Sequence, residues 1–289
     1  MAHAAPDLSD LPPGIVVADT ITKLPANAAG CVVVSGSHGG RYPGYLAAAG
    51  GVRAVILCDA GIGRDEAGIG ALPYLEGLGI AAAAVSHLSC RIGDTTDMLE
   101  RGTISRANGP AAAIGVEPGD TTLAAAECLR AAELAVVKPA PLGEARSFVD
   151  LPGERRIVLL DSAALVGPED IDQIVVTGSH GGLVGGSPAM ALRVDGFAAV
   201  YNDAGIGMES AGIARLPALD RRGIAAFTVS AQSARIGDAR SSYEDGMISA
   251  VNETAATLGA QVGEPAHSVL RHWASLPRAS RHTSGRERA

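Results

Sequence analysis

The chain has few aromatic residues, no surplus of positive charge and no long apolar run, and each shortage excludes a class of protein. Aromatic residues make up 3% of the 289 residues, so a core must be packed from small aliphatic side chains. The net charge is −8, whereas a nucleic-acid-binding protein presents a basic surface. No apolar run approaches the roughly 20 residues of a membrane-spanning helix. We therefore expect neither a nucleic-acid partner nor a membrane partner.

Cysteine is also scarce, and its distribution is uneven. All four cysteines lie in the N-terminal half, and no Cys-x-x-Cys pair is present. A disulfide that served both halves of the chain would occur twice, so we expect free thiols and no structural zinc. The N-terminal segment MAHAAPDLSDLPPG lacks the charged and then apolar order of a signal peptide. These features predict a cytoplasmic location.

What the sequence has in abundance is repetition. The segment Val32–Gly40 (VVVSGSHGG) returns as Ile174–Gly182 (IVVTGSHGG), and Asp59–Gly63 (DAGIG) returns as Asp203–Gly207. The offset is 142 residues for the first pair and 144 for the second, so two residues are inserted just after the second GSHGG block. A period of this length corresponds to a whole α/β layer. We predict an α/β protein of two tandem homologous units with mainly parallel sheets, related by a pseudo-twofold axis.

The apolar pattern divides the chain into four parts. We predict a first α/β unit over residues 14–135, a linker over 136–155, a second unit over 156–275 and a basic tail over 276–289. Eight apolar runs are the predicted strands: Ile15–Ala18, Cys31–Ser35, Ala54–Cys58, Ile80–Val85, Ile157–Leu160, Gln173–Thr177, Ala198–Asn202 and Ile224–Val229. The predicted helices of the first half are Glu66–Leu78, Thr95–Ile114 and Leu123–Ala135. Their predicted counterparts in the second half are Ser210–Arg222 and Arg240–Leu258.

Repeated polar residues follow each predicted strand, where parallel α/β sheets bind their ligands. The candidate catalytic residues are Ser37, His38, Asp59, Ser179, His180 and Asp203. The candidate substrate-binding residues are Gly39, Gly40, Ser86, Arg91, Asp94, Gly181, Gly182, Asn202, Ser230, Arg235 and Asp238.

The GSHGG blocks predict an anion-binding loop beside a histidine. Three glycines around a Ser-His pair let the backbone turn sharply and expose N–H groups to a carboxylate, a phosphate or a developing oxyanion. His38 and His180 would then act as acid or base, because imidazole titrates near neutrality. The alternative is a tight strand-to-helix turn with a hydrogen-bonded histidine. Neither GxGxxG nor GxxxxGK[ST] occurs, so we expect no nucleotide cofactor and no other cofactor.

Two further repeats have a functional and a structural interpretation each. In DAGIG, Asp59 and Asp203 either orient the neighbouring histidine or cap the following helix. In RIGD, Arg91 and Arg235 either grip a substrate carboxylate or form an internal ion pair with the aspartate three residues later.

The two halves differ at positions that bear on chemistry. Cys58, His87 and Cys90 stand where the second half has Asn202, Ala231 and Ala234. The order of a strand with His-Gly followed by a strand with Cys resembles that of caspases over about 25 residues, which implies a cysteine nucleophile. The QAC context of that family is missing and the cysteine is not repeated. A metal site would require His38, His87 and Asp59 to converge, and no HxH or HExxH spacing supports one.

The favoured function is hydrolysis of a C–N or C–O bond in a small polar metabolite that bears a carboxylate or an amide. The expected substrate is anionic. A homo-oligomer is a further expectation. One alternative is an isomerase or racemase that uses one histidine from each half. Its layout resembles that of aspartate/glutamate racemases, although their paired cysteines are absent. The other alternative is a non-catalytic protein that binds a small molecule.

Overall fold

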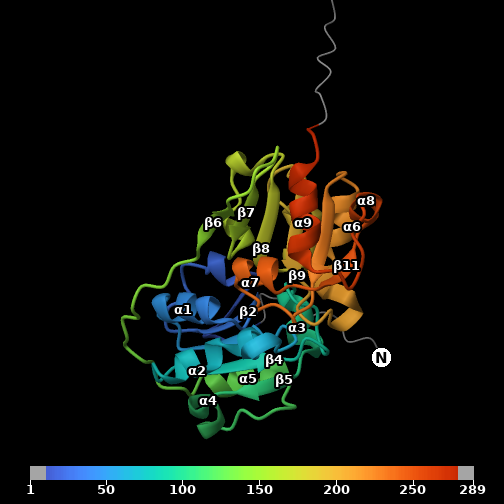
Figure 1. Ribbon diagram of the computed structural model, residues 1–289. Helices are drawn as coiled ribbons and strands as arrows, with labels where there is room; N and C mark the ends of the chain where they lie inside the picture. Colours follow the sequence, from blue (N-terminus) through green and yellow to red (C-terminus); the bar gives the residue numbers. More distant parts are fainter. Residues whose placement is uncertain (1–10, 279–289) are drawn as a thin grey trace, which may run out of the picture.

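The computed structural model describes residues 11–278, which form two mixed and mostly parallel sheets with helices between their strands (Figure 1). The first sheet has the order β1-β2-β3-β4-β5, and its last strand is antiparallel to its neighbour. Its strands are β1 (Ile15–Ala18), β2 (Val32–His38), β3 (Ala54–Cys58), β4 (Ala81–Val85) and β5 (Ile104–Ala107).

The second sheet has the order β11-β10-β9-β8-β7-β6, with antiparallel strands at both edges. Its strands are β6 (Arg146–Val149), β7 (Ile157–Leu160), β8 (Ile174–His180), β9 (Ala198–Asn202), β10 (Ala225–Val229) and β11 (Ile248–Val251). The segment between the two sheets runs along one side of the molecule, in light green in Figure 1, and ends in the edge strand β6.

Helices cover both faces of each sheet, as the continuous apolar strands require. The first sheet carries α1 (Arg41–Ala49), η3 (Arg64–Ile69), α2 (Ala71–Glu76), α3 (Thr95–Arg101), α4 (Gly109–Ala113) and α5 (Thr122–Leu129), besides the turn η2 (Ile21–Lys23). The second sheet carries η8 (Met208–Ile213), α6 (Arg215–Asp220), α7 (Ala239–Glu244), α8 (Glu253–Thr257) and α9 (Ala266–Ser275), besides the turns η4 (Ala163–Leu165), η5 (Pro168–Asp170), η6 (Val184–Gly186) and η7 (Pro188–Met190).

The predicted strands are all present, whereas the two longest predicted helices are wrong. The stretch Thr95–Ile114 divides into α3, the edge strand β5 and α4, and Arg240–Leu258 divides in the same way around β11. α3 ends where Gly102 leaves the helical conformation and donates its amide to the Met98 carbonyl, and a Cβ at this position would overlap that oxygen. The predicted linker 136–155 contains β6, and residues 279–289 of the predicted tail lie outside the described residues.

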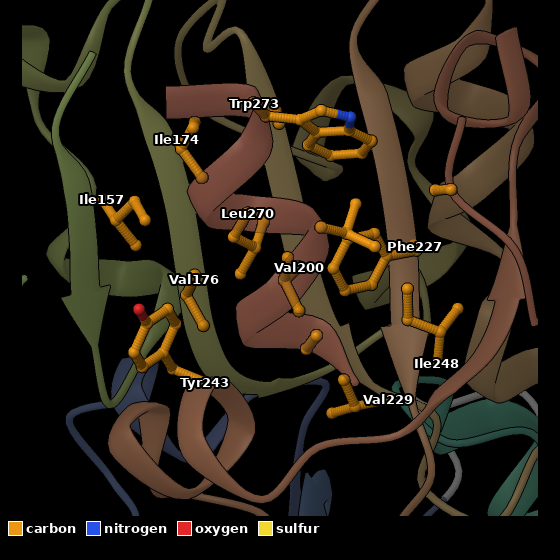
Figure 2. Packing of buried hydrophobic residues seen from close by; sticks show 14 of the residues in the cluster. Ile157, Ile174, Val176, Val200, Phe227, Val229, Tyr243, Ile248, Leu270 and Trp273 are labelled. Atoms are coloured by element: carbon orange, nitrogen blue, oxygen red, sulfur yellow. The ribbon is translucent and has the colours of Figure 1, made fainter. Parts of the chain in front are cut away.

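The core of the second sheet is closed by α9. Figure 2 shows Leu270 and Trp273 of this helix over Val200 and Phe227 of the sheet. The Trp273 ring lies 5.7 Å from that of Phe227, and its indole nitrogen donates to the Leu258 carbonyl at 3.0 Å. Phe197 meets the same indole ring edge-on at 6.3 Å, so three aromatic side chains pack together under α9. Within residues 11–278 no helix is long and apolar enough to cross a bilayer.

The DAGIG loops join the two halves of the molecule. Gly61 meets Gly205 so closely that a Cβ on Gly61 would lie 2.8 Å from the Gly205 Cα. On either side of this contact the Arg64 amide donates to the Ala231 carbonyl and the Met208 amide donates to the His87 carbonyl, each at 2.8 Å. The repeated glycines thus serve close packing of two backbones across the junction.

We expect Gly61→Ala to destabilise the protein more than Gly79→Ala. Both glycines have positive φ, +76° and +72°, but no atom lies within 4 Å of a Cβ on Gly79. Each alanine incurs about 1 kcal/mol for the left-handed backbone, and Gly61→Ala adds about 1–3 kcal/mol of overlap. Urea unfolding measures both losses, and equal losses would show that the Gly61–Gly205 contact is not tight.

Candidate functional site

A cavity of about 110 Å³ lies between the two halves and receives residues from both. Its polar lining is formed by Thr20, Thr22, Lys23, Ser37, His38, Tyr42, Glu144, Asp161, Ser162, Ser179, His180, Arg193 and Arg215. The GSHGG blocks of the two halves therefore meet at one cavity.

The strand register brings each Ser-His pair to the cavity. Strands β2 and β8 run on through Gly-Ser-His, and the register slips before the histidine, so that His38 pairs with Cys58 and His180 with Asn202. The Ser37 and Ser179 hydroxyl oxygens accept hydrogen bonds from the first residues of the turns η2 and η4, at 3.0 and 2.9 Å. Each serine is thereby fixed at the cavity wall with its own proton free to donate.

Both cavity histidines are held in the neutral state by burial. Burial lowers the pKa of His38 from 6.5 to about 4. Burial lowers the pKa of His180 well below 6.5, and the charges of Arg215 and His38 lower it further. Both imidazoles line the same cavity, and His38 acts on the pKa of His180 there. At neutral pH each ring therefore carries a single proton.

The hydrogen bonds at Nδ1 determine where that proton is. The Gly40 amide donates to His38 Nδ1 and the Gly182 amide donates to His180 Nδ1, each at 3.2 Å. A nitrogen that accepts a hydrogen bond needs its lone pair, so the proton of each neutral ring must lie on Nε2. Neither Nε2 has a hydrogen-bond partner within residues 11–278. The site thus presents two uncharged N–H donors.

The glycine of each RIGD block positions the histidine of the opposite half. A Cβ on Gly93 would lie 3.4 Å from His180 Cε1, and a Cβ on Gly237 would lie 3.4 Å from His38 Cε1. Both glycines have positive φ, +85° and +83°. Each also donates its amide hydrogen to the glycine that opens the GSHGG block of its own half. RIGD therefore links the two histidine loops.

The linker contributes a carboxyl group with an unusual pKa. Glu144 lines the cavity, where burial raises its pKa from 4.5 to about 7 and the charge of Asp161 adds to the increase, while a hydrogen bond from Ser162 opposes it. Glu144 also acts on Tyr42 across the cavity: burial raises the pKa of the phenol, and the charge of Glu144 raises it further. This carboxyl group changes its protonation state near neutrality.

A buried guanidinium lies on the wall beside His180. Arg215 is 4% exposed and starts α6. Its Nε donates to the Gly182 carbonyl at 3.0 Å, and its Nη1 donates to the carbonyls of Met190 and Ala191 at 3.0 and 2.6 Å. Its guanidinium carbon lies 4.8 Å from the centre of the Tyr201 ring. Within residues 11–278 no carboxylate pairs with it.

The aspartates of DAGIG lie outside the cavity lining. Asp59 accepts hydrogen bonds from the Gly61 amide at 3.2 Å and from the amide and ring Nδ1 of His87 at 2.9 and 2.8 Å. Asp203 accepts from the Gly205 and Ala231 amides, both at 2.9 Å. The two carboxylates therefore stabilise the loops that follow β3 and β9. Among the described residues, neither carboxylate forms a hydrogen bond with His38 or His180.

The arginines of RIGD also lie outside the cavity lining, in ion pairs that cross between the halves. Arg91 pairs with Glu209 at 2.8 Å, and Arg235 pairs with Asp65 at 2.7 Å. Arg91 also donates a hydrogen bond to Asp94. Asp94 and Asp238 each accept a hydrogen bond from a backbone amide in the first turn of the helix that follows them. Arg91 thus forms the internal ion pair of the structural alternative with Asp94, whereas Arg235 pairs with Asp65 of the other half and has no ion pair with Asp238 among the described residues.

The remaining predicted ligand-binding groups have hydrogen-bond partners within their own half. Gly39 and Gly181 donate their amides to the carbonyls of Cys58 and Asn202, at 2.6 and 2.8 Å, so that these amides are already used. The hydroxyl oxygens of Ser86 and Ser230 each accept from the amide two residues later. Asn202 is buried and donates to the Ala234 carbonyl at 3.0 Å.

The unrepeated residues of the first half lie away from the cavity lining as well. Cys58 and Cys90 are buried and in contact, and hydrogen bonding to Cys90 raises the pKa of Cys58 well above its usual value, which opposes a thiolate nucleophile. His87 bonds to Asp59 and packs against Gly205. In the part of the chain that the structure describes, no group of three His, Cys, Asp or Glu side chains is placed to hold a metal ion.

Glu144 and Arg215 are the two site residues with a proposed chemical role that the sequence did not reveal. Glu144 lies in the linker and Arg215 stands where the first half has Ala71, so neither belongs to a repeated motif. Comparisons with family models, with curated proteins and with solved structures find no match for this chain. The geometry of the cavity is therefore what indicates the function.

Proposed function

We propose that the protein is an enzyme that hydrolyses a C–N or C–O bond next to a carbonyl in a small polar molecule, at one composite site. We also propose that its halves are two homologous units related by a pseudo-twofold axis, because the same Ser-His pair reaches the cavity from each. The observation that carries the proposal is the pair of neutral imidazoles, His38 and His180, each with Nδ1 occupied and Nε2–H available.

Two neutral N–H donors suit a negative charge that develops on oxygen. When a carbonyl carbon becomes tetrahedral its oxygen takes up the charge, and fixed donors stabilise it most strongly in a site shielded from water. In this proposal His38 and His180 donate from Nε2 to that oxygen. In this proposal the imidazoles bind the oxyanion instead of the GSHGG amides. The Gly40 and Gly182 amides already donate to Nδ1 of the two histidines and thereby fix their tautomer.

Glu144 is the proposed proton-transfer group. In its ionised form it takes a proton from water while the oxygen of that water adds to the carbonyl carbon. The protonated carboxyl group then gives the proton to the departing nitrogen or oxygen as the C–N or C–O bond breaks. A pKa of about 7 suits both steps, because the base and its conjugate acid are both populated near neutral pH.

The test is a screen of small amides, esters and lactams in water enriched in ¹⁸O. Hydrolysis predicts cleavage with one ¹⁸O in the acid product. Tight binding of several members without conversion of any of them would contradict catalysis and support the non-catalytic binding alternative.

Isomerisation or racemisation is the second candidate, since both histidines line a single cavity. A two-base mechanism requires one imidazole to accept a proton at Nε2, and the hydrogen bonds to Nδ1 oppose this. The candidate is retained only with Glu144 as the base and an enolate as the charged intermediate. Deuterium that enters carbon from D₂O without bond cleavage would identify it. The cytoplasmic location and a homo-oligomeric state stay predictions.

A further inference from the structure

We propose that Arg215 binds a carboxylate of the substrate, so that the cavity selects anionic carbonyl compounds. This inference rests on the proposed function, because only that function makes the bound anion a substrate. It places the anchor in the second half alone, on a residue without a repeated counterpart, and it replaces Arg91 and Arg235 in that role.

The burial and pairing of Arg215 are the first argument. A guanidinium that is 4% exposed normally has a carboxylate partner, because an uncompensated buried charge is costly. The described residues supply backbone carbonyls, the Tyr201 ring and a hydrogen bond with the Tyr201 hydroxyl, but no carboxylate. Nη2 has no carbonyl or carboxylate acceptor within residues 11–278, and Arg215 lines the cavity, so an anionic ligand there could compensate its charge.

The surroundings of Arg215 are the second argument. At the same position of the repeat the first half has Ala71, against which Gly44 of α1 packs. In the second half the turns η6 and η7 take the place of that helix, and Arg215 bonds to the carbonyls of this segment. The exposed cations Lys23 and Arg193 line the same cavity and, with Arg215, outnumber its two carboxyl groups, Glu144 and Asp161.

The position of the guanidinium relative to His180 is the third argument. Arg215 Nε donates to the carbonyl of Gly182, whose amide donates to His180 Nδ1. Arg215 lines the same cavity as both histidines, so a carboxylate bound to it would share that cavity with the Nε2–H donors. A short molecule with a carboxylate next to a reactive carbonyl, such as a half-amide of a dicarboxylic acid, fits both groups at once.

A binding titration with acetate tests the inference without requiring turnover. Acetamide serves as the neutral molecule of the same shape, sodium chloride keeps the ionic strength constant, and NMR follows the Arg215 Nε–H and the His180 imidazole. Acetate should bind saturably, and acetamide should bind about tenfold to a hundredfold more weakly. Arg215→Lys and Arg215→Met should weaken acetate binding by a similar factor, since the flexible ammonium lacks the fork.

Arg222→Met is the matched control. Arg222 also donates to carbonyls of this region, those of Leu192 and Val194, but it does not line the cavity. Acetate affinity that survives in Arg215→Lys, or equal binding of acetate and acetamide by the parent, would overturn the inference. If Arg215→Met does not fold, Arg215→Lys decides the matter. Arg215-dependent acetate binding without hydrolysis of any compound would leave the inference standing and reject the proposed function.

Discussion

Replacing either cavity histidine with alanine is expected to lower kcat by about 10²–10³-fold, the usual loss when one oxyanion donor is removed. Because His38 and His180 line one cavity and make equivalent hydrogen bonds, the two losses should be similar. The variants should stay folded, since each ring has only one hydrogen bond to the described residues, from a backbone amide. The measurement is kcat on the best substrate from the screen.

A glutamine variant separates a donor from a base. The amide of glutamine can donate a hydrogen bond but cannot accept a proton near neutral pH, so His38→Gln and His180→Gln should keep more activity than the alanine variants. His87→Ala is the matched control, because His87 lies outside the cavity lining and the second half already has Ala231 at that position. Glutamine variants as inactive as the alanine variants would favour proton transfer by histidine.

Glu144→Gln is expected to lower kcat by about 10²–10⁴-fold, the usual contribution of a positioned proton-transfer group. In the parent protein the rate should rise with pH through about 7, as Glu144 becomes ionised, and the variant should lose this step. Glu154→Gln, in an exposed part of the same linker, is the control and should behave as the parent. A parent profile that is flat between about pH 5 and 8 would remove Glu144 from the mechanism.

Stability gives an independent measurement on the same carboxyl group. The folded-state pKa of Glu144 is raised above its usual 4.5, so the folded protein binds this proton more tightly than the unfolded chain does. The free energy of unfolding should therefore decrease as the pH rises from about 4.5 to about 7, because of this group. Glu144→Gln should be more stable than the parent above pH 7, and urea unfolding at two pH values measures the difference.

The strands were predictable from the sequence because their side chains are buried on both faces. Ala54–Cys58 and Ala198–Asn202 are short and almost wholly apolar, and only a covered parallel sheet accommodates such runs. The edge strands β5 and β11 escaped because each lies between two short helices, so that the whole stretch was predicted as one helix. The edge strand β1 is equally short and partly exposed, but no helix precedes it among the described residues, and it was predicted.

The candidate site was predictable only where it is repeated. Repetition singled out His38 and His180, but it singled out Asp59 and Arg91 as strongly, and the structure places these two in loop and junction contacts. Repetition does not separate the two roles, because a residue that forms a contact across the junction is repeated in both halves just as a catalytic residue is. Glu144 and Arg215 were missed because their importance depends on burial and charge in the folded chain.

The protonation of His38 and His180 is the central claim, and ¹⁵N NMR of the labelled imidazoles measures it directly without a substrate. From about pH 5 to pH 8, both rings should stay neutral with the proton on Nε2 and the lone pair on Nδ1. A proton on Nδ1 of either ring, or titration of both rings near pH 6.5, would contradict the account.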